Sequence, residues 1–270
     1  MKITFLGGGN MANALIGGLR KQGFSAAGIQ VIEPLTENRE RLAGTFHVRC
    51  CEAVDAAALN CEVLVLAVKP QQMREALAPL AGKLTGQLVV SIAAGLRLTD
   101  IGRWLGGYRL LVRAMPNMAA LIGEGMTGLY ADPSVGREGR DMAEKILRAV
   151  GSALWIEDEA QMDAVTAVSG SGPAYVFYFI EALQLAAEAL GFDDDAARVL
   201  AIETFVGAAR LAEQSPESVA LLRERVTSQG GTTEAALLSF ARDGVAAGIQ
   251  RGVAAADARG RELGELMGKD

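Results

Sequence analysis

The spacing of hydrophobic and polar positions changes near residue 156 of this chain. Before that point, short apolar runs alternate with stretches in which apolar residues recur at helical spacing. Such alternation is typical of a mostly parallel sheet covered by helices on both faces. We therefore predict a right-handed, doubly wound α/β domain of the Rossmann-like kind over residues 1–156. Past that point no comparably strong strand pattern appears, which predicts an all-α domain over residues 157–270.

The apolar runs of the first half predict a series of buried strands. The run at 62–68 is continuous, as expected for a strand that is covered on both faces of a parallel sheet. In such sheets ligands bind beyond the carboxyl ends of the strands, so residues that follow the strands are candidate site residues. The predicted strands are 3–6, 29–33, 46–49, 62–68 and 88–92, with 109–114 and 128–131 as further candidates.

The helical half begins with a segment that is apolar on nearly every side. Pro173 stands near the first helical position, where its missing N–H costs nothing, and Gly191 ends the helix. A helix of this kind has to be buried, and the half is too short to bury it alone. We predict that it is buried against the same half of a second copy. Further helices are predicted from a cap at 193–195 to 206, at 216–226, from 234 and at 245–266.

Composition and charge exclude several classes of function. The chain has 270 residues and a net charge of −6, without a Lys/Arg run, which excludes a nucleic-acid or anionic-membrane surface. The longest apolar stretches are too short or too interrupted to span a bilayer, and no signal peptide opens the chain. Cys50, Cys51 and Cys61 lack zinc-site spacing, and His47 is the only histidine, so no metal is expected. We predict a cytoplasmic protein.

Gly7-x-Gly9-x-x-Ala12 lies between the first predicted strand and a helix, which is the context of a dinucleotide-binding fingerprint. Gly7 permits the sharp bend, and Gly9 has no side chain to keep phosphates away. The helix that follows directs free N–H groups and a partial positive charge at those phosphates. The alternative is a glycine-rich turn without a ligand. The residues predicted to bind the cofactor here are Leu6, Gly7, Gly8, Gly9, Asn10 and Met11.

Further candidates for the cofactor follow later strands. Glu33 stands where an acidic residue holds the ribose hydroxyls of NAD, but Asn38 and Arg39 follow closely and could meet the 2′-phosphate of NADP instead. Glu33 could also be a solvated residue at the end of a strand with no role in binding. The choice between NADP and NAD therefore stays open. Small residues at 93–95 let a flat ring approach the backbone. The remaining predicted cofactor residues are Ala67, Val68, Lys69, Pro70, Ala93 and Ala94.

One loop in the helical half has the composition of a binding site. Its two glycines, Gly230 and Gly231, are surrounded by the hydroxyls of Ser228, Thr232 and Thr233. A helix that begins near Thr233 points its free amides into the loop, which suits a carboxylate-sized anion. The same sequence would also serve as an ordinary loop with a helix cap.

Six motifs follow one another along the chain: the glycine turn, 67–71, 91–95, 113–117, 169–175 and 226–233. Taken together, they resemble the pyrroline-5-carboxylate reductase family over nearly the whole chain. The resemblance implies reduction of a cyclic imine to L-proline with NADPH or NADH. It also implies an intertwined homodimer of the helical domains, often assembled into larger rings, with an active site completed by both chains. Two positions depart from the family pattern: Gln229 replaces a usual proline, and Cys50 replaces an asparagine near the ribose.

Reduction of an imine requires a hydride donor, an electrophilic carbon and a proton on nitrogen, so no Lys or His base is obligatory. We expect the substrate carboxylate to be held by backbone amides and two hydroxyls of this loop. They are the amides of Gly230, Gly231, Thr232 and Thr233 and the hydroxyls of Ser228 and Thr233. Thr233 is the best candidate to hydrogen-bond the ring nitrogen, so Thr233 and Ser228 are the predicted catalytic residues. Glu213 loosely matches a family position near the substrate nitrogen and is predicted as an electrostatic helper.

Two other functions fit part of the pattern. A β-hydroxyacid-type NAD(P) dehydrogenase shares the fold plan, but it carries a catalytic lysine on the first long helix of its second domain, and 173–190 contains none. A non-catalytic NAD(P)-sensing dimer would bind the cofactor and would need no anion-binding loop facing the nicotinamide.

Overall fold

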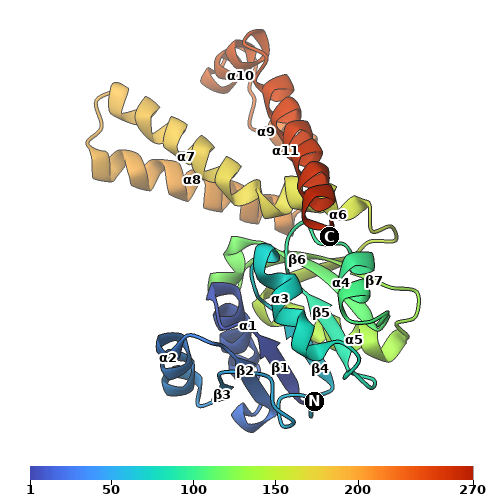
Figure 1. The fold of residues 1–270 in the computed structure, drawn as a ribbon. Coiled ribbons are helices and arrows are strands. Elements are labelled where there is room, and N and C mark those ends of the chain that lie inside the picture. The colour runs from blue at the N-terminus through green and yellow to red at the C-terminus, as the bar shows by residue number, and fades with distance from the viewer. Residues whose placement is uncertain (270) are drawn as a thin grey trace. The chain divides into compact units, whose positions relative to one another are not determined.

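Eight strands form one sheet in the computed structural model of the chain, which describes residues 1–269 (Figure 1). Their order is β3-β2-β1-β4-β5-β6-β7-β8; the first six run parallel, β7 is antiparallel to β6, and β8 is parallel to β7. The predicted α/β class with a doubly wound domain is confirmed. The strands are β1 Ile3–Leu6, β2 Ile29–Ile32, β3 Arg49–Cys51, β4 Val63–Leu66, β5 Leu88–Ser91, β6 Leu111–Pro116, β7 Gly125–Ala131 and β8 Gly151–Trp155.

Helices cover both faces of this sheet and bury the central strands, β1, β4 and β5, completely. One core cluster joins the sheet to α1, α2 and α5, and the other joins it to α3 and α4. The polypeptide changes direction of winding between β1 and β4, and at such a switch point the strand ends leave a crevice for a ligand. The helices are α1 Asn10–Lys21, α2 Thr36–Phe46, α3 Met73–Leu77, α4 Leu98–Trp104, α5 Arg137–Leu147 and α6 Gln161–Val165, with short 3₁₀ turns between them.

Two strands differ from the sequence-based expectation. The strand predicted at 46–49 was wrong in position, because α2 continues to Phe46 and ends at His47 in the left-handed region, φ 56°. The strand proper follows at Arg49–Cys51. Strand β8 was not predicted, because it opens with Gly151 and Ser152 and its apolar part, 153–155, is short.

The other helices are α7 Gly172–Ala189, α8 Asp194–Gln214, α9 Val219–Arg225, α10 Thr232–Arg242 and α11 Val245–Met267. The Asp193 carboxylate caps α8 by accepting a hydrogen bond from the Ala196 amide, as predicted. Helix α9 begins three residues later than predicted because Ser218 caps it. No residue of α7 is buried. Between 172 and 255 the only buried apolar residues are Ala197 and Ala201.

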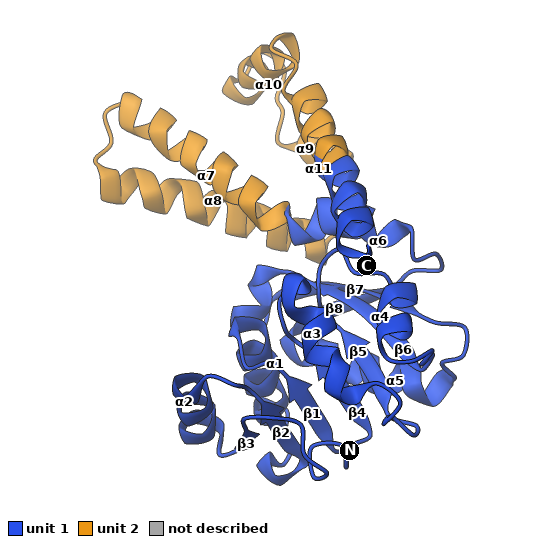
Figure 2. Ribbon diagram, viewed as in Figure 1, with its two compact units in different colours: residues 1–171, 256–270 blue, residues 172–255 orange. Residues whose placement is uncertain are grey.

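Contacts divide the chain into two compact units (Figure 2). Unit 1 comprises residues 1–171 and the segment from Ala256 onward, and unit 2 comprises 172–255. Helix α6 belongs to unit 1 because Glu159 and Asp163 form ion pairs with the buried Arg113 of β6. The predicted boundary between functional domains at 156/157 stays a prediction. Within residues 1–269, no helix is both long enough and apolar enough to traverse a bilayer.

Candidate active site

The first strand ends in a turn that only glycine can form. Gly7 has φ +100°, and its amide donates a hydrogen bond to the Ile32 carbonyl at 2.8 Å. A Cβ atom at Gly7 would lie 2.7 Å from the Ala67 carbonyl oxygen, so any side chain would push the turn away from the end of β4. Position and backbone conformation thus both require the glycine that the fingerprint predicts.

The start of α1 is open to an anion. A Cβ atom at Gly9 would have no neighbour within 4 Å, and no side chain caps the helix. Among residues 1–269, no acceptor binds the backbone amides of Asn10 and Met11. Free amides and a positive helix end beside empty space fit the pyrophosphate of a dinucleotide.

Glu33 follows β2 and is 6% exposed. Its two carboxylate oxygens accept hydrogen bonds from the amides of Gly8 at 2.8 Å and Leu35 at 2.9 Å. In this structure the side chain therefore holds the glycine turn to the end of β2.

Two arginines of α2 lie beside the same strand end. Arg39 donates to the carbonyls of Glu33 at 2.8 Å and Pro34 at 2.6 Å. Arg41 donates to the Asn38 side chain at 3.2 Å and more weakly to the Gly8 carbonyl at 3.4 Å. Sequence reasoning missed Arg41, although its spacing of three from Asn38 puts both on one helix face.

The other predicted cofactor residues lie at the same edge of the sheet as the turn. The Ala67 amide donates to the Leu6 carbonyl at 2.8 Å, and the Ile92 amide donates to the Leu66 carbonyl at 3.1 Å. The segments 67–70 and 93–94 therefore start side by side at this edge, because each follows the end of a buried strand. Lys69 is exposed at this edge and precedes the turn at Pro70.

The end of β6 adds residues that sequence reasoning did not assign. The Asn117 side chain accepts a hydrogen bond from the Met126 amide at 3.2 Å and donates one to the Ser169 hydroxyl at 3.4 Å. Ser169 lies in the π-helical turn Thr166–Gly170, a geometry that recurs at functional sites. A Cβ atom at Gly170 would lie 2.7 Å from Met115 Cε, so this turn packs closely on β6.

Cys50 lies on β3 opposite Val31 of β2. Burial raises the pKa of its thiol, and Cys51 contributes in the same direction. The thiol is therefore protonated at neutral pH and does not act as a nucleophile there.

The loop that precedes α10 belongs to unit 2. Gly230 has φ +72°, and the Gly231 amide donates to the Ser228 carbonyl at 3.0 Å. The Gly230 amide donates to the Glu234 carboxylate at 2.7 Å. Within residues 1–269 the amides of Thr232 and Thr233 have no acceptor, so they are the donors free for a ligand. Glu234 was not predicted as a site residue; an acidic residue in the first turn of a helix, as here in α10, is typical of helix N-termini.

Glu213 lies in the last turn of α8 and is exposed. No hydrogen bond or ion pair joins it to the loop within the described residues.

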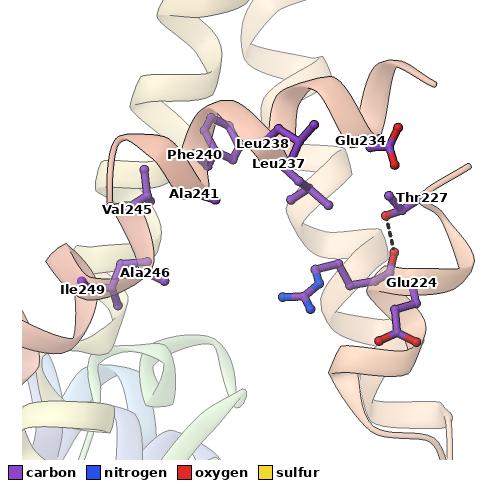
Figure 3. Close-up of a pocket in the computed structure, with 13 residues that line it drawn as sticks. Glu224, Thr227, Glu234, Leu237, Leu238, Phe240, Ala241, Val245, Ala246 and Ile249 are labelled. Carbon is purple, nitrogen blue, oxygen red and sulfur yellow. Dashed lines mark hydrogen bonds between the residues drawn. The ribbon is translucent and has the colours of Figure 1, made fainter. Parts of the chain in front are cut away.

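Unit 2 also contains an apolar groove of about 750 Å³ between α9, α10 and α11. Figure 3 shows Leu237, Leu238 and Phe240 of α10 with Val245 and Ile249 of α11 along it, and Glu224 on the α9 side. Its lining is too apolar for a small zwitterionic ring and is suited to the side chains of another helix.

Comparisons with known proteins agree along the whole chain. A family model described as pyrroline-5-carboxylate reductase dimerisation matches residues 159–263, and one described as NADP oxidoreductase, coenzyme F420-dependent, matches residues 2–95. The pyrroline-5-carboxylate reductase of Pseudomonas aeruginosa is 46% identical over 99% of this chain and 98% of its own length.

Two solved structures extend the likeness to three dimensions. A pyrroline-5-carboxylate reductase from Coxiella burnetii superposes with a TM-score of 0.91 at 39% identity, over 97% of this chain and 98% of the other. The pyrroline carboxylate reductase of Plasmodium falciparum, with NADP bound, gives a TM-score of 0.86 at 26% identity over 98% of both chains.

Proposed function

The chain belongs to the pyrroline-5-carboxylate reductase family, and we infer that it reduces 1-pyrroline-5-carboxylate to L-proline, the last step of proline biosynthesis, with NADPH or NADH as hydride donor. The resemblance that the motifs indicated is thereby confirmed. The observation that carries the inference is 46% identity over 99% of the chain to a reductase of that name. The open start of α1, with free amides beside Gly9, supports binding of the cofactor's pyrophosphate there.

NADP is the better supported cofactor. Both oxygens of the Glu33 carboxylate already accept a hydrogen bond from a backbone amide, and the side chain is 6% exposed, so little of the carboxylate is accessible to ribose hydroxyls. Arg39 and Arg41 put two cations beside that strand end, where the charge of a 2′-phosphate would be stabilised. One of the solved relatives also has NADP bound.

The residues proposed for substrate binding are those of the loop before α10. The amides of Thr232 and Thr233 are free to hold the substrate carboxylate, with Ser228 supplying a hydroxyl, while Gly230 and Gly231 shape the loop. The bound cofactor supplies the hydride that reaches the imine carbon. We assign to Thr233 the hydrogen bond to the ring nitrogen, which gains a lone pair or a proton as the C=N bond is reduced. Glu213 remains a predicted electrostatic helper.

Positioning accounts for most of the rate in this proposal. The substrate already contains the acceptor carbon, and solvent can supply the proton on nitrogen. The protein therefore has to hold the ring at near-attack distance and exclude other orientations. A β-hydroxyacid-type dehydrogenase would instead need a lysine on the first long helix of its second domain. The corresponding helix here, α7, contains none.

The proposed assembly is a homodimer through the helical region. Residues 159–263 match a dimerisation model, and unit 2 exposes a long apolar surface with a groove of about 750 Å³. We propose that residues 157–270 form the substrate-binding and dimerisation domain. A ring of dimers and a cytoplasmic location stay predictions from the sequence.

The decisive experiment is an assay of cofactor oxidation by the purified protein with 1-pyrroline-5-carboxylate. NADPH and NADH are compared at equal concentrations, and the product is identified as L-proline by chromatography. We expect turnover with both cofactors and a higher kcat/KM with NADPH. If the protein binds NADPH but shows no turnover with NADPH and none with NADH, the proposed function is contradicted. That result would favour the non-catalytic NAD(P)-sensing dimer.

The role of Thr233 is tested by Thr233→Ala. Loss of one hydrogen bond made mainly in the transition state should lower kcat/KM by about 10-fold to 1000-fold. Thr227→Ala is the matched control, because the Thr227 hydroxyl is committed to the Arg223 carbonyl at 2.6 Å. Its kcat/KM should stay within about 2-fold of the parent. Equal kinetics in the two variants would remove Thr233 from the mechanism.

A further inference from the structure

The last turn of α11 packs directly on the segment that follows β5. A Cβ atom at Gly95 would lie 2.4 Å from Met267 Cε, and one at Gly264 would lie 3.0 Å from the Gly95 carbonyl oxygen. Gly95 also has φ +78°, a conformation that favours glycine. Glycine on both sides allows this close approach, and all of these residues belong to unit 1.

The end of the helix is anchored to α4 as well. The Arg103 guanidinium donates to the Gly268 carbonyl at 2.7 Å. A Cβ atom at Gly268 would lie 2.5 Å from an Asp100 carboxylate oxygen, so that position too is in close contact. Met267 packs against the core cluster that contains Ala93, Leu96 and Leu98. We call residues 264–268 the C-terminal clasp.

The segment that the clasp covers has little support of its own. Residues 93–95 are two alanines and a glycine, and the sheet ladder ends before them at Ser91. Among the described residues 1–269, the Ala93 amide donates only to the Ser91 hydroxyl, at 3.4 Å. A backbone with such small side chains depends on what packs against it, and at Gly95 the neighbour is Met267.

We propose that the C-terminal clasp is a positioning element for the nicotinamide: it fixes residues 93–95, whose small side chains let the flat ring of the cofactor of the proposed function approach the backbone. The inference rests on that placement of the cofactor. An error of about 1 Å in a ring that donates hydride costs up to about 100-fold in rate, so support behind the segment affects both affinity and turnover. The role requires no contact between Met267 and the cofactor.

The test uses the full chain and two cofactor probes. Met267→Ala removes the support, Met267→Leu keeps most of its volume, and affinity is measured by titration for NADPH and for 2′-phospho-ADP-ribose, which lacks the nicotinamide. We expect Met267→Ala to weaken the affinity for NADPH by about 10-fold and to lower kcat. Its affinity for 2′-phospho-ADP-ribose should change by less than about 2-fold. Met267→Leu should restore both values.

A second pair of variants separates the contact from a general effect on the helix. Gly264→Val pushes the clasp away from the Gly95 carbonyl and should repeat the loss for NADPH alone. Gly260→Ala, one turn earlier, has room, because its Cβ would lie 3.6 Å from the Asp163 side chain. It should bind both probes like the parent.

Two results would overturn the proposal. One is a Met267→Ala variant with unchanged NADPH affinity and kcat, and the other is an equal loss of affinity for NADPH and for 2′-phospho-ADP-ribose. The titrations need no substrate, so they remain decisive for a chain that binds NADPH and fails to reduce 1-pyrroline-5-carboxylate. Such a chain would contradict the proposed function alone.

Discussion

At the scale of single residues, Glu33 shows how one side chain can be assigned two opposite roles. Its distance from the glycine turn is typical of an acid that binds ribose hydroxyls. In the structure the carboxylate accepts hydrogen bonds from the amides of Gly8 and Leu35, and is 6% exposed. Buried amides that lose their acceptor cost about 1–3 kcal/mol each. Glu33 therefore stabilises the turn, and in the proposed function the neighbouring arginines decide the choice of cofactor.

Glu33 and Arg41 should accordingly fail in different ways. Glu33→Gln leaves one turn amide facing an NH₂ group, so KM should rise by about 5-fold to 30-fold for NADPH and NADH alike. Arg41→Ala removes a charge beside the 2′-phosphate and should raise KM for NADPH by about 10-fold while leaving NADH within about 2-fold. Steady-state kinetics with both cofactors measure this. A loss confined to NADH in Glu33→Gln would restore the ribose assignment.

At the scale of elements, a buried ion-pair cluster fixes α6 to the sheet. Arg113 of β6 is 3% exposed, and it lies 3.2 Å from a Glu159 oxygen and 3.6 Å from an Asp163 oxygen. The same Glu159 oxygen accepts a hydrogen bond from the Leu98 amide at 2.8 Å, which ties the start of α4 to the cluster. Removing one partner from such a buried ion-pair cluster leaves an uncompensated charge, which destabilises the folded protein.

Removing the cation alone should therefore be costly. Arg113→Met leaves two carboxylates without their counter-charge, and we expect a loss of about 3–5 kcal/mol in the free energy of unfolding. The triple variant Arg113→Met, Glu159→Gln, Asp163→Leu keeps an acceptor for the Leu98 amide and should recover most of that loss. Urea unfolding of the three proteins measures both values. A triple variant as unstable as Arg113→Met would mean that the cluster does not act as a unit.

The sequence predicted some strands better than others, and the burial pattern and backbone conformation of each strand explain the difference. Strands β1, β4 and β5 are covered on both faces, so their apolar runs are unbroken and were located correctly. Strand β8 alternates between exposed and partly buried positions, and that pattern is too short to distinguish from a loop. The shift of β3 arose at His47, whose left-handed backbone ends α2 without the usual glycine.

The candidate site was predictable to a similar degree. Glycines and strand ends identify the cofactor edge, because backbone geometry requires those residue types there. The links from Glu33 to Gly8, from Glu234 to Gly230 and from Met267 to Gly95 join residues through side-chain conformation. A sequence pattern does not specify such conformations, so these contacts emerged only from the structure.

At the scale of the whole molecule, apolar surface is concentrated in unit 2. Helix α7 has no buried residue, although its sequence is apolar almost all round, and Phe177, Tyr178 and Leu185 are each more than half exposed. So many exposed large apolar side chains on one helix indicate an interaction surface. The sequence had predicted a helix that needs burial, and the single chain leaves that need to a second copy.

Leu185→Glu should therefore disrupt assembly. A charge placed on a face that the partner covers costs several kcal/mol, enough to shift a dimer to monomer at micromolar concentration. Sedimentation velocity should then give the monomer mass with α-helical circular dichroism retained, and kcat/KM should fall if both chains complete the site. Leu154→Glu in β8 is the matched control, since Leu154 is 54% exposed and Leu185 58%. The control should keep the parent mass. A dimeric Leu185→Glu beside a monomeric Leu154→Glu would move the interface from the helical unit to the sheet edge.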